Sequence, residues 1–195
     1  MPQGNIDAAC QVAHAIGTHR LAPEYDYYTA VDDLQPEDTE GADMIGTIQF
    51  NASCLYRYAA LDTSQLAANL GEDVDVTPAV AAFTRAFALA IPTGKQNTFA
   101  ARNPPSAILG VRRAAGAWNL ANAFITPIHA AAAEKGVATA STVAMLSEFA
   151  SLQRMYGRAD ENVQAALLSA ETVDVPAGVD PVEHLDALVH HVAAP

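Results

Sequence analysis

Strict alternation of apolar and polar residues over residues 47–58 is the feature that most constrains the fold. The two faces of this stretch carry Ile48, Phe50, Ala52, Cys54, Tyr56 and Tyr58 on one side, and Thr47, Gln49, Asn51, Ser53 and Arg57 on the other. A period of two residues places successive side chains on opposite faces of a strand. Residues 47–58 are therefore predicted to form one long strand of an antiparallel sheet, with one face packed and the other polar.

Helical spacing and helix-ending residues predict helices on both sides of this strand. The first should begin near Asn5, a capping residue, and fade within 17–20. Thr77 as cap, Pro78 at the first helical position and Pro92 beyond the end delimit another. Further helices are expected at about 63–70, closed by Gly71, at about 141–156, and after the capping-box arrangement of Asp180 and Glu183.

Two short segments, 106–111 and 118–124, have the composition of additional strands. Helices would thus alternate with antiparallel strands along the chain. Such an order is typical of an α+β fold and argues against a doubly wound parallel sheet. With 195 residues, the chain is long enough for a single domain with a real core.

The stretch 23–43 holds eight carboxylates and no Lys or Arg, and it shows neither the helical nor the strand period. It is too long for an ordinary compact connection, so a protruding loop or hairpin is expected. Three interpretations stay open for its acidic residues: a solvated loop, a surface facing a basic partner, or a divalent-cation site. Under the last, Asp26, Asp32 and Asp33 would serve a metal-dependent nuclease.

Residues 84–113 contain five cations and no carboxylate, although the chain as a whole carries a net charge of −12. The overall charge argues against a nucleic-acid partner. Phosphate binding responds to the local field, however, and this segment is where that field could be positive. From the residues alone, a solvated basic surface and a phosphate-binding surface are both possible.

Common catalytic and cofactor motifs do not fit the chain. The Gly94-Lys95 pair lacks the P-loop pattern, because Leu89 stands where a glycine is needed and Gln96 follows the lysine. His14 and His19 are five residues apart, a spacing that does not favour a zinc pair on a helix. We therefore expect no cofactor and no metal. No apolar stretch is long enough to span a membrane, and two cysteines without metal-ligand spacing fit a cytoplasmic protein.

Several segments, taken in order, resemble one family: CasC, the repeated backbone subunit of the type I-E CRISPR surveillance complex Cascade. They are "QVAHAIGTHR" (11–20), "EYDYYTAVDDL" (24–34), "GADMIGTIQFNASCLYRYAALD" (41–62), "AIPTGKQNTFAARNPP" (90–105) and "LANAF" (120–124). Their number, order and spacing over most of 8–125 make the resemblance specific.

This resemblance implies a non-enzymatic protein that coats guide RNA. The family's palm is a ferredoxin-like core of the RNA-recognition-motif type, with helical fingers and an extended thumb hairpin. Residues 21–47 would be the thumb. Copies stack head to tail along the guide, so the implied partners are guide RNA, other copies of the subunit, other Cascade subunits and, through the guide, target DNA.

The resemblance also implies RNA-binding positions. The palm loop corresponds to Thr93, Gly94, Lys95, Gln96 and Asn97. In that loop the lysine would supply charge, the glycine would allow close approach, and the two amides would donate to phosphate or ribose oxygens. Arg102 and Arg20 are further candidates, and Met44 and Ile45, at the return of the thumb, would wedge against bases.

Family members are longer, and the chain resembles their C-terminal portion without the first strand, first helix and most of the fingers. A palm without its first strand would leave a sheet edge unpaired. We therefore expect the isolated chain to pair with an N-terminal partner, to self-associate, or to be marginally stable. An inactive truncated relic and a protein-interaction domain are the alternatives to an RNA-binding subunit.

Overall fold

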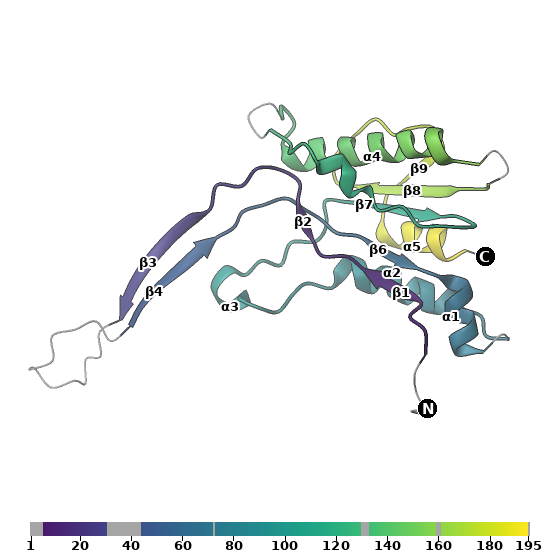
Figure 1. The fold of residues 1–195 in the computed structure, drawn as a ribbon, viewed down its shortest axis with the longest axis horizontal. Coiled ribbons are helices and arrows are strands. Elements are labelled where there is room, and N and C mark those ends of the chain that lie inside the picture. Colours follow the sequence, from purple (N-terminus) through teal and green to yellow (C-terminus); the bar gives the residue numbers. More distant parts are fainter. Residues whose placement is uncertain (1–5, 31–43, 72, 130–132, 159–160, 195) are drawn as a thin grey trace, which may run out of the picture.

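The computed structural model describes residues 6–30, 44–71, 73–129, 133–158 and 161–194. The elements in chain order are β1 (Cys10–Val12), β2 (Ile16–Gly17), β3 (Glu24–Ala30), β4 (Met44–Phe50), β5 (Leu55–Tyr56), β6 (Ala59–Leu61), α1 (Thr63–Leu70), α2 (Thr77–Leu89), α3 (Gln96–Phe99), β7 (Ala107–Arg112), the 3-10 helix η1 (Leu120–Phe124), α4 (Val137–Tyr156), β8 (Gln164–Ser169), β9 (Val179–Val182) and α5 (Leu185–Ala193). The α+β class is thereby confirmed (Figure 1).

The core lies around a three-stranded sheet of order β7-β8-β9, with α4 on one face and α5 on the other (Figure 1). Alternation along β8 explains this layering. Ala165 and Leu167 pack with Leu146 and Phe149 of α4, whereas Ala166 faces the opposite side and is fully buried. One correction concerns direction: β7 and β8 are antiparallel, but β8 and β9 are parallel, so the sheet is mixed.

Close packing of α5 on β7 depends on Gly110. A Cβ atom at this position would lie 2.5 Å from Val192 Cγ2 and 3.2 Å from Leu188 Cδ1. The absence of a side chain therefore lets the helix approach the strand, and Leu188 is fully buried there.

The predicted long strand over 47–58 is wrong in its continuity. Two strands fall in this range, and they pair antiparallel with different partners, β4 with β3 and β5 with β2; the next strand, β6, follows the predicted range and pairs with β1. Alternation reports a locally extended backbone, but it does not specify the partner strand. The expected packed face is only partly buried along β4, where Ile48 is half-buried and Phe50 is 39% exposed.

The predicted first helix is wrong, because residues 10–12 and 16–17 are the strands β1 and β2. Pairing with the later segment 54–61 overrides the weak local helical pattern. Backbone bonds from Ala13 N to Tyr58 O and from Thr18 N to Cys54 O, both 3.0 Å, extend these pairings beyond the strands.

The other predicted elements have mixed outcomes. Helices α1 and α2 and strand β7 are confirmed, with Gly71 closing α1 at a φ of 116°. The N-cap position of α2 is Val76, one residue before the expected cap Thr77, and it makes no side-chain capping bond; α4 begins at Val137, before the predicted start. The segment 118–124 was expected to be a strand, but most of it forms η1, which Asn119 caps by accepting from Ala121 N. The expected capping box at Asp180 and Glu183 is wrong, because 179–182 pairs with β8 as β9.

No helix among the described residues is long and apolar enough to cross a membrane.

Candidate nucleic-acid interface

Strands β3 and β4 form a hairpin that projects from the rest of the chain (Figure 1). Their register runs from Glu24 opposite Phe50 to Ala30 opposite Met44. The expectation of a protruding loop or hairpin over 23–43 is confirmed for residues 23–30, and 31–43 lie outside the described residues. The assignment of 21–47 as a thumb stays a prediction. Met44 and Ile45 belong to the far end of β4, so their expected contact with bases stays a prediction.

The two faces of the hairpin differ in charge. Residues directly opposite each other in an antiparallel pair share a face. One face carries Tyr25, Tyr27, Thr47 and Gln49, all uncharged; the other carries Glu24, Asp26, Tyr28, Gly46, Ile48 and Phe50. The tyrosines are exposed, with Tyr25 at 55% and Tyr27 at 73%. On the acidic face the Tyr28 ring occupies the space that a side chain at Gly46 would need.

The base of the hairpin is fixed to the body by Thr18 and His19. Thr18 is 1% exposed; its carbonyl accepts from Ile128 N at 2.9 Å, and its hydroxyl lies 2.8 Å from that of Ser141 in α4. The His19 ring accepts from Cys54 N–H at Nε2 (3.1 Å), and its Nδ1 lies 2.9 Å from the Arg20 carbonyl oxygen, a contact that the Nδ1–H tautomer makes as a hydrogen bond. The imidazole thus bridges the segments that lead into the two hairpin arms.

The loop from Pro92 to Ala101 closes on itself around the one-turn helix α3. Gln96 Nε2 donates to the carbonyls of Pro92 (2.6 Å) and Ala101 (3.2 Å). Lys95 and Ala100, on either side of α3, both adopt left-handed backbone conformations, with φ values of 60° and 47°. The two amide hydrogens that we expected Gln96 to offer to RNA are thus donated within the loop.

The remaining loop candidates face outward. Thr93, Gly94, Lys95 and Asn97 are exposed, and a Cβ atom at Gly94 would meet no atom within 4 Å. The loop therefore presents an open surface on which a ligand could approach the backbone closely.

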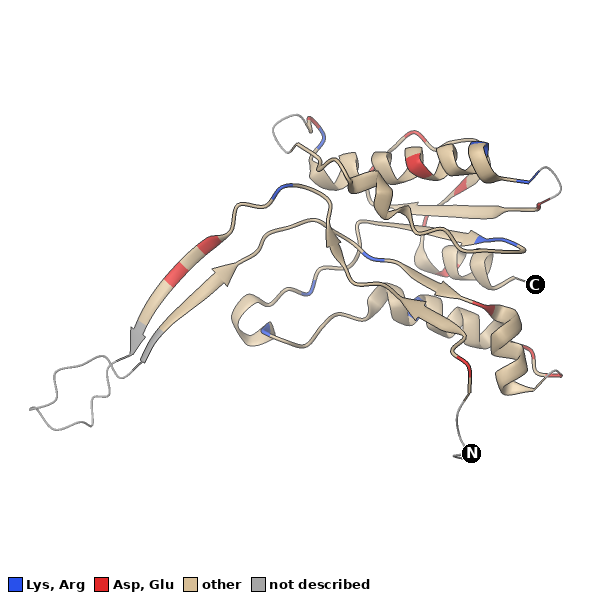
Figure 2. Ribbon diagram, viewed as in Figure 1, with Lys and Arg blue, Asp and Glu red and all other residues tan. Residues whose placement is uncertain are grey.

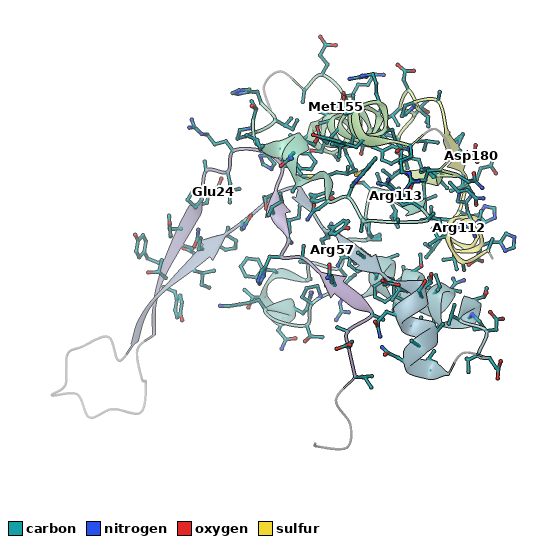
Figure 3. The ribbon with its side chains drawn as sticks, turned by 45° about the vertical axis from the view of Figure 1, so that its right-hand side comes forward. Glu24, Arg57, Arg112, Arg113, Met155 and Asp180 are labelled. Atoms are coloured by element: carbon teal, nitrogen blue, oxygen red, sulfur yellow. The ribbon has the colours of Figure 1, made fainter. Side chains whose placement is uncertain are left out.

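Three of the five cations in 84–113 contact other groups of the protein, two of them partly buried and one, Arg85, on the surface. Arg85 pairs with Asp186 at 2.6 Å, and Arg112 Nη2 donates to Gln164 Oε1 at 2.7 Å. Arg113 forms a two-pronged contact with Glu161, with both N–O distances at 2.9 Å, and its guanidinium lies 3.5 Å from the centre of the Trp118 ring. The hydrogen bond from Arg113 is the main cause that lowers the pKa of Glu161. Figure 3 shows Arg112 and Arg113 within the body, away from Glu24 on the hairpin.

The other two cations of the segment, Lys95 and Arg102, are exposed. Among the described residues, no hydrogen bond or ion pair engages either side chain. Figure 2 shows the positive charge on the loop around α3 and the negative charge on β3. The basic segment therefore has two parts: one whose cations are paired within the protein and one whose cations have no partner among the described residues.

An aromatic contact joins this loop to the hairpin. The rings of Phe50, at the end of β4, and Phe99, at the end of α3, meet edge to face with centroids 5.4 Å apart. Lys95 is thus held beside the base of the hairpin in the same chain, as Figure 1 shows for α3. Arg20 is exposed on the connection that leads into β3.

The sequence model of the CT1975-like protein family, a family of Cas proteins, matches residues 1–191. The chain belongs to the CT1975-like family. No curated protein matches it.

Two solved structures contain chains similar to this CT1975-like protein. One is titled "CRISPR RNA-guided surveillance complex, pre-nicking"; it is 28% identical with a TM-score of 0.85, over 99% of this chain and 51% of that chain. The other, "CRISPR RNA-guided surveillance complex", has the same identity and TM-score over 100% of this chain and 73% of that chain. The CT1975-like chain thus spans about half the length of the first of these proteins.

Sequence reasoning missed Arg57, which helps to place the loop of this CT1975-like chain. Its guanidinium donates to the carbonyls of Phe87 and Ala90 at the C-terminal end of α2 and lies 4.8 Å from the centre of the Phe87 ring (Figure 3). A cation is favoured there by the helix dipole and the free carbonyls. The alternation pattern had placed Arg57 on a polar strand face, and nothing nearby in sequence indicates its partners.

The acidic residues considered as a metal site are only partly described. Asp26 lies on β3 opposite Ile48, and Asp32 and Asp33 fall outside the described residues. Among the residues that are described, no group of three or more His, Cys, Asp or Glu side chains could hold a metal ion.

Proposed function

We propose that this CT1975-like chain is a non-catalytic, guide RNA-binding backbone subunit of a Cascade-type CRISPR surveillance complex. Family membership and the two similar chains from CRISPR RNA-guided surveillance complexes support a Cascade-type function. The narrower assignment, a type I-E CasC subunit with a palm of the RNA-recognition-motif type, rests on the sequence resemblance. The expected location is the cytoplasm.

The observation that carries the RNA-binding proposal is the placement of Lys95 and Arg102. They are the cations of the carboxylate-free segment that have no partner within the described residues. Lys95 lies in the loop that contacts the base of the projecting hairpin, and Arg102 directly follows that loop. Exposed cations beside an open backbone surface are the groups that bind phosphates. Arg85, Arg112 and Arg113 are paired with other protein side chains. The proposed RNA contact therefore uses only Lys95 and Arg102 of the five cations in 84–113.

The hairpin would then contact the nucleotides or a neighbouring copy through its uncharged face. Tyrosine rings can stack on bases, and their hydroxyl groups can hydrogen-bond to polar atoms. The face with Tyr25 and Tyr27 can approach RNA without opposing carboxylates, whereas Glu24 and Asp26 on the other face would repel phosphates. Stacking of several copies along one guide would leave bases accessible to target DNA.

RNA titration tests the proposal directly. Lys95→Ala is expected to weaken binding of a labelled single-stranded RNA about three- to tenfold, because one charge-assisted phosphate contact is lost. The slope of log affinity against log salt should fall in magnitude by about 0.7, the value for one phosphate contact on a single strand. Lys135→Ala is the matched control, because Lys135 is the other lysine of the chain and is also exposed.

Equal affinity and equal salt slope for wild type and Lys95→Ala would remove Lys95 from the interface. Binding by one isolated chain should be weak, so the titration needs low salt and high protein concentration. Co-purification separates the alternatives: a functional subunit should bring down guide RNA or other Cascade subunits, and an inactive relic should bring down neither. Incubation with Mg²⁺ or Mn²⁺ and single-stranded RNA tests the nuclease alternative.

A further inference from the structure

The edge-to-face contact between Phe50 and Phe99 links two elements that are separate in sequence. Phe50 ends β4, and Phe99 ends α3 within the Lys95 loop. Phe50 is 39% exposed, so it is not a core residue that happens to be near the loop. The ring pair is instead a surface contact between the hairpin and the loop.

The conformation of the loop needs such support. Lys95 and Ala100 occupy left-handed backbone regions, which residues with a Cβ atom adopt only when their surroundings hold them there. Within the loop, the amides of Thr98 and Phe99 donate to Lys95 O, and Gln96 Nε2 bridges two carbonyls. All of these bonds lie within the loop, so none of them fixes its position relative to the hairpin or supports the left-handed residues from outside.

We propose that the Phe50–Phe99 pair couples the hairpin to the Lys95 loop, so that both contact the RNA as one rigid unit. Phe50 and Phe99 are then positioning residues: they act through Lys95 and touch no phosphate themselves. The expected effect on RNA binding rests on the proposed function. The coupling between hairpin and loop can be measured in the free protein, without RNA.

The coupling has a consequence that a general loss of stability would not produce. Phe99→Ala removes no charge, yet it should free the loop and reduce the contact between Lys95 and a phosphate. We expect binding of labelled single-stranded RNA to weaken about three- to tenfold, with the salt slope falling by up to about 0.7, toward that of Lys95→Ala. The double variant Phe99→Ala/Lys95→Ala should have the same slope as Lys95→Ala alone.

Two further variants serve as controls in the same titration. Phe99→Tyr keeps an aromatic ring and should retain the wild-type slope. Phe83→Ala removes a ring from another phenylalanine pair, Phe83–Phe87 on α2, whose centroids are 6.1 Å apart, and should leave the slope unchanged. A slope for Phe99→Ala equal to that of wild type, at any affinity, would overturn the coupling.

Hydrogen exchange of the free protein gives the second test and keeps the two proposals separate. Phe50→Ala alters the hairpin only, but it should accelerate exchange of the amides of Thr98, Phe99 and Ala100, whose acceptors lie in the loop. Exchange at Val80 in α2 should not change. Unaltered loop exchange in Phe50→Ala would refute the coupling, whereas faster exchange in a protein that binds no RNA would support the coupling and refute the RNA-binding role.

Discussion

The sheet region and the hairpin region treat their charged and aromatic side chains in opposite ways. In the sheet, Arg113 and Glu161 have side chains only 10% and 6% exposed and are paired with each other, and β8 is buried between α4 and α5. In the hairpin and its loop, Tyr25 and Tyr27 stand in solvent, and Lys95 has no partner among the described residues. The first region pairs these groups internally, whereas in the second region they are exposed.

This difference indicates that the residues that stabilise the fold and the residues proposed to bind a ligand lie in different regions of the chain. Burial of apolar surface and satisfied hydrogen bonds supply most of the free energy of folding. The sheet with its two helices therefore carries the fold, and the hairpin contributes little beyond its own ladder. Substitutions in the two regions should consequently affect different measurements, which provides the tests below.

The largest effect on stability is expected from Leu188→Ala. Leu188 is fully buried between α5 and β7, so its truncation should lower the free energy of unfolding by about 2–5 kcal/mol. Leu89→Ala, at a leucine that is 54% exposed, is the matched control and should change it by less than about 0.5 kcal/mol. Urea unfolding measures both. Similar midpoints for the two variants would show that the sheet does not carry the stability.

A smaller effect is expected at Tyr56, which lies on β5 between the two regions. Its hydroxyl accepts from Leu120 N–H at 2.9 Å, and its ring packs against Phe124 with centroids 5.3 Å apart. Tyr56→Phe leaves that N–H without its acceptor and should cost about 1 kcal/mol at neutral pH.

The same residue predicts a dependence on alkaline pH. Burial is the main cause that raises the pKa of Tyr56 from 10.0 to about 12. Because the unfolded chain ionises first, the stabilising contribution of the neutral hydroxyl is present below pH 10 and is lost as the pH rises toward 12. Urea unfolding between these pH values should show a shallower decline for Tyr56→Phe than for wild type. If the free energy of unfolding fell equally with pH in both proteins, Tyr56 would not be a cause of the loss of stability at alkaline pH.

Local sequence signals predicted those elements whose causes are local. Gly71 ends α1 through its positive φ, and Pro78 lies in the first turn of α2, so both helices could be located from the sequence. Strands β1 and β2 could not, because they exist through pairing with residues 54–61. The same holds for β9, where parallel pairing with β8 took a segment that resembled a helix start.

The candidate site divides in the same way. The carboxylate-free segment identified Lys95 and Arg102, whose exposed charges need no distant partner to be recognised. It also included Arg113, whose partner Glu161 is 48 residues away and whose role in the sheet is invisible in the local pattern. The contact between Phe50 and Phe99 was likewise beyond sequence reasoning, because periodicity describes one segment at a time.

The smallest effect on stability is expected from Tyr27→Ala, which tests whether the uncharged face of the hairpin is unpacked in the free protein. The Tyr27 ring is 73% exposed and shares its face with Thr47, so its removal should change the free energy of unfolding by less than about 0.5 kcal/mol. Tyr28→Ala is the informative neighbour: its ring covers Gly46 across the strands, so its loss should destabilise the hairpin by up to about 1 kcal/mol. A loss well above 1 kcal/mol for Tyr27→Ala would mean that its face is packed in the free protein. That face could then not be reserved for RNA or a neighbouring copy, because the protein itself would already cover it.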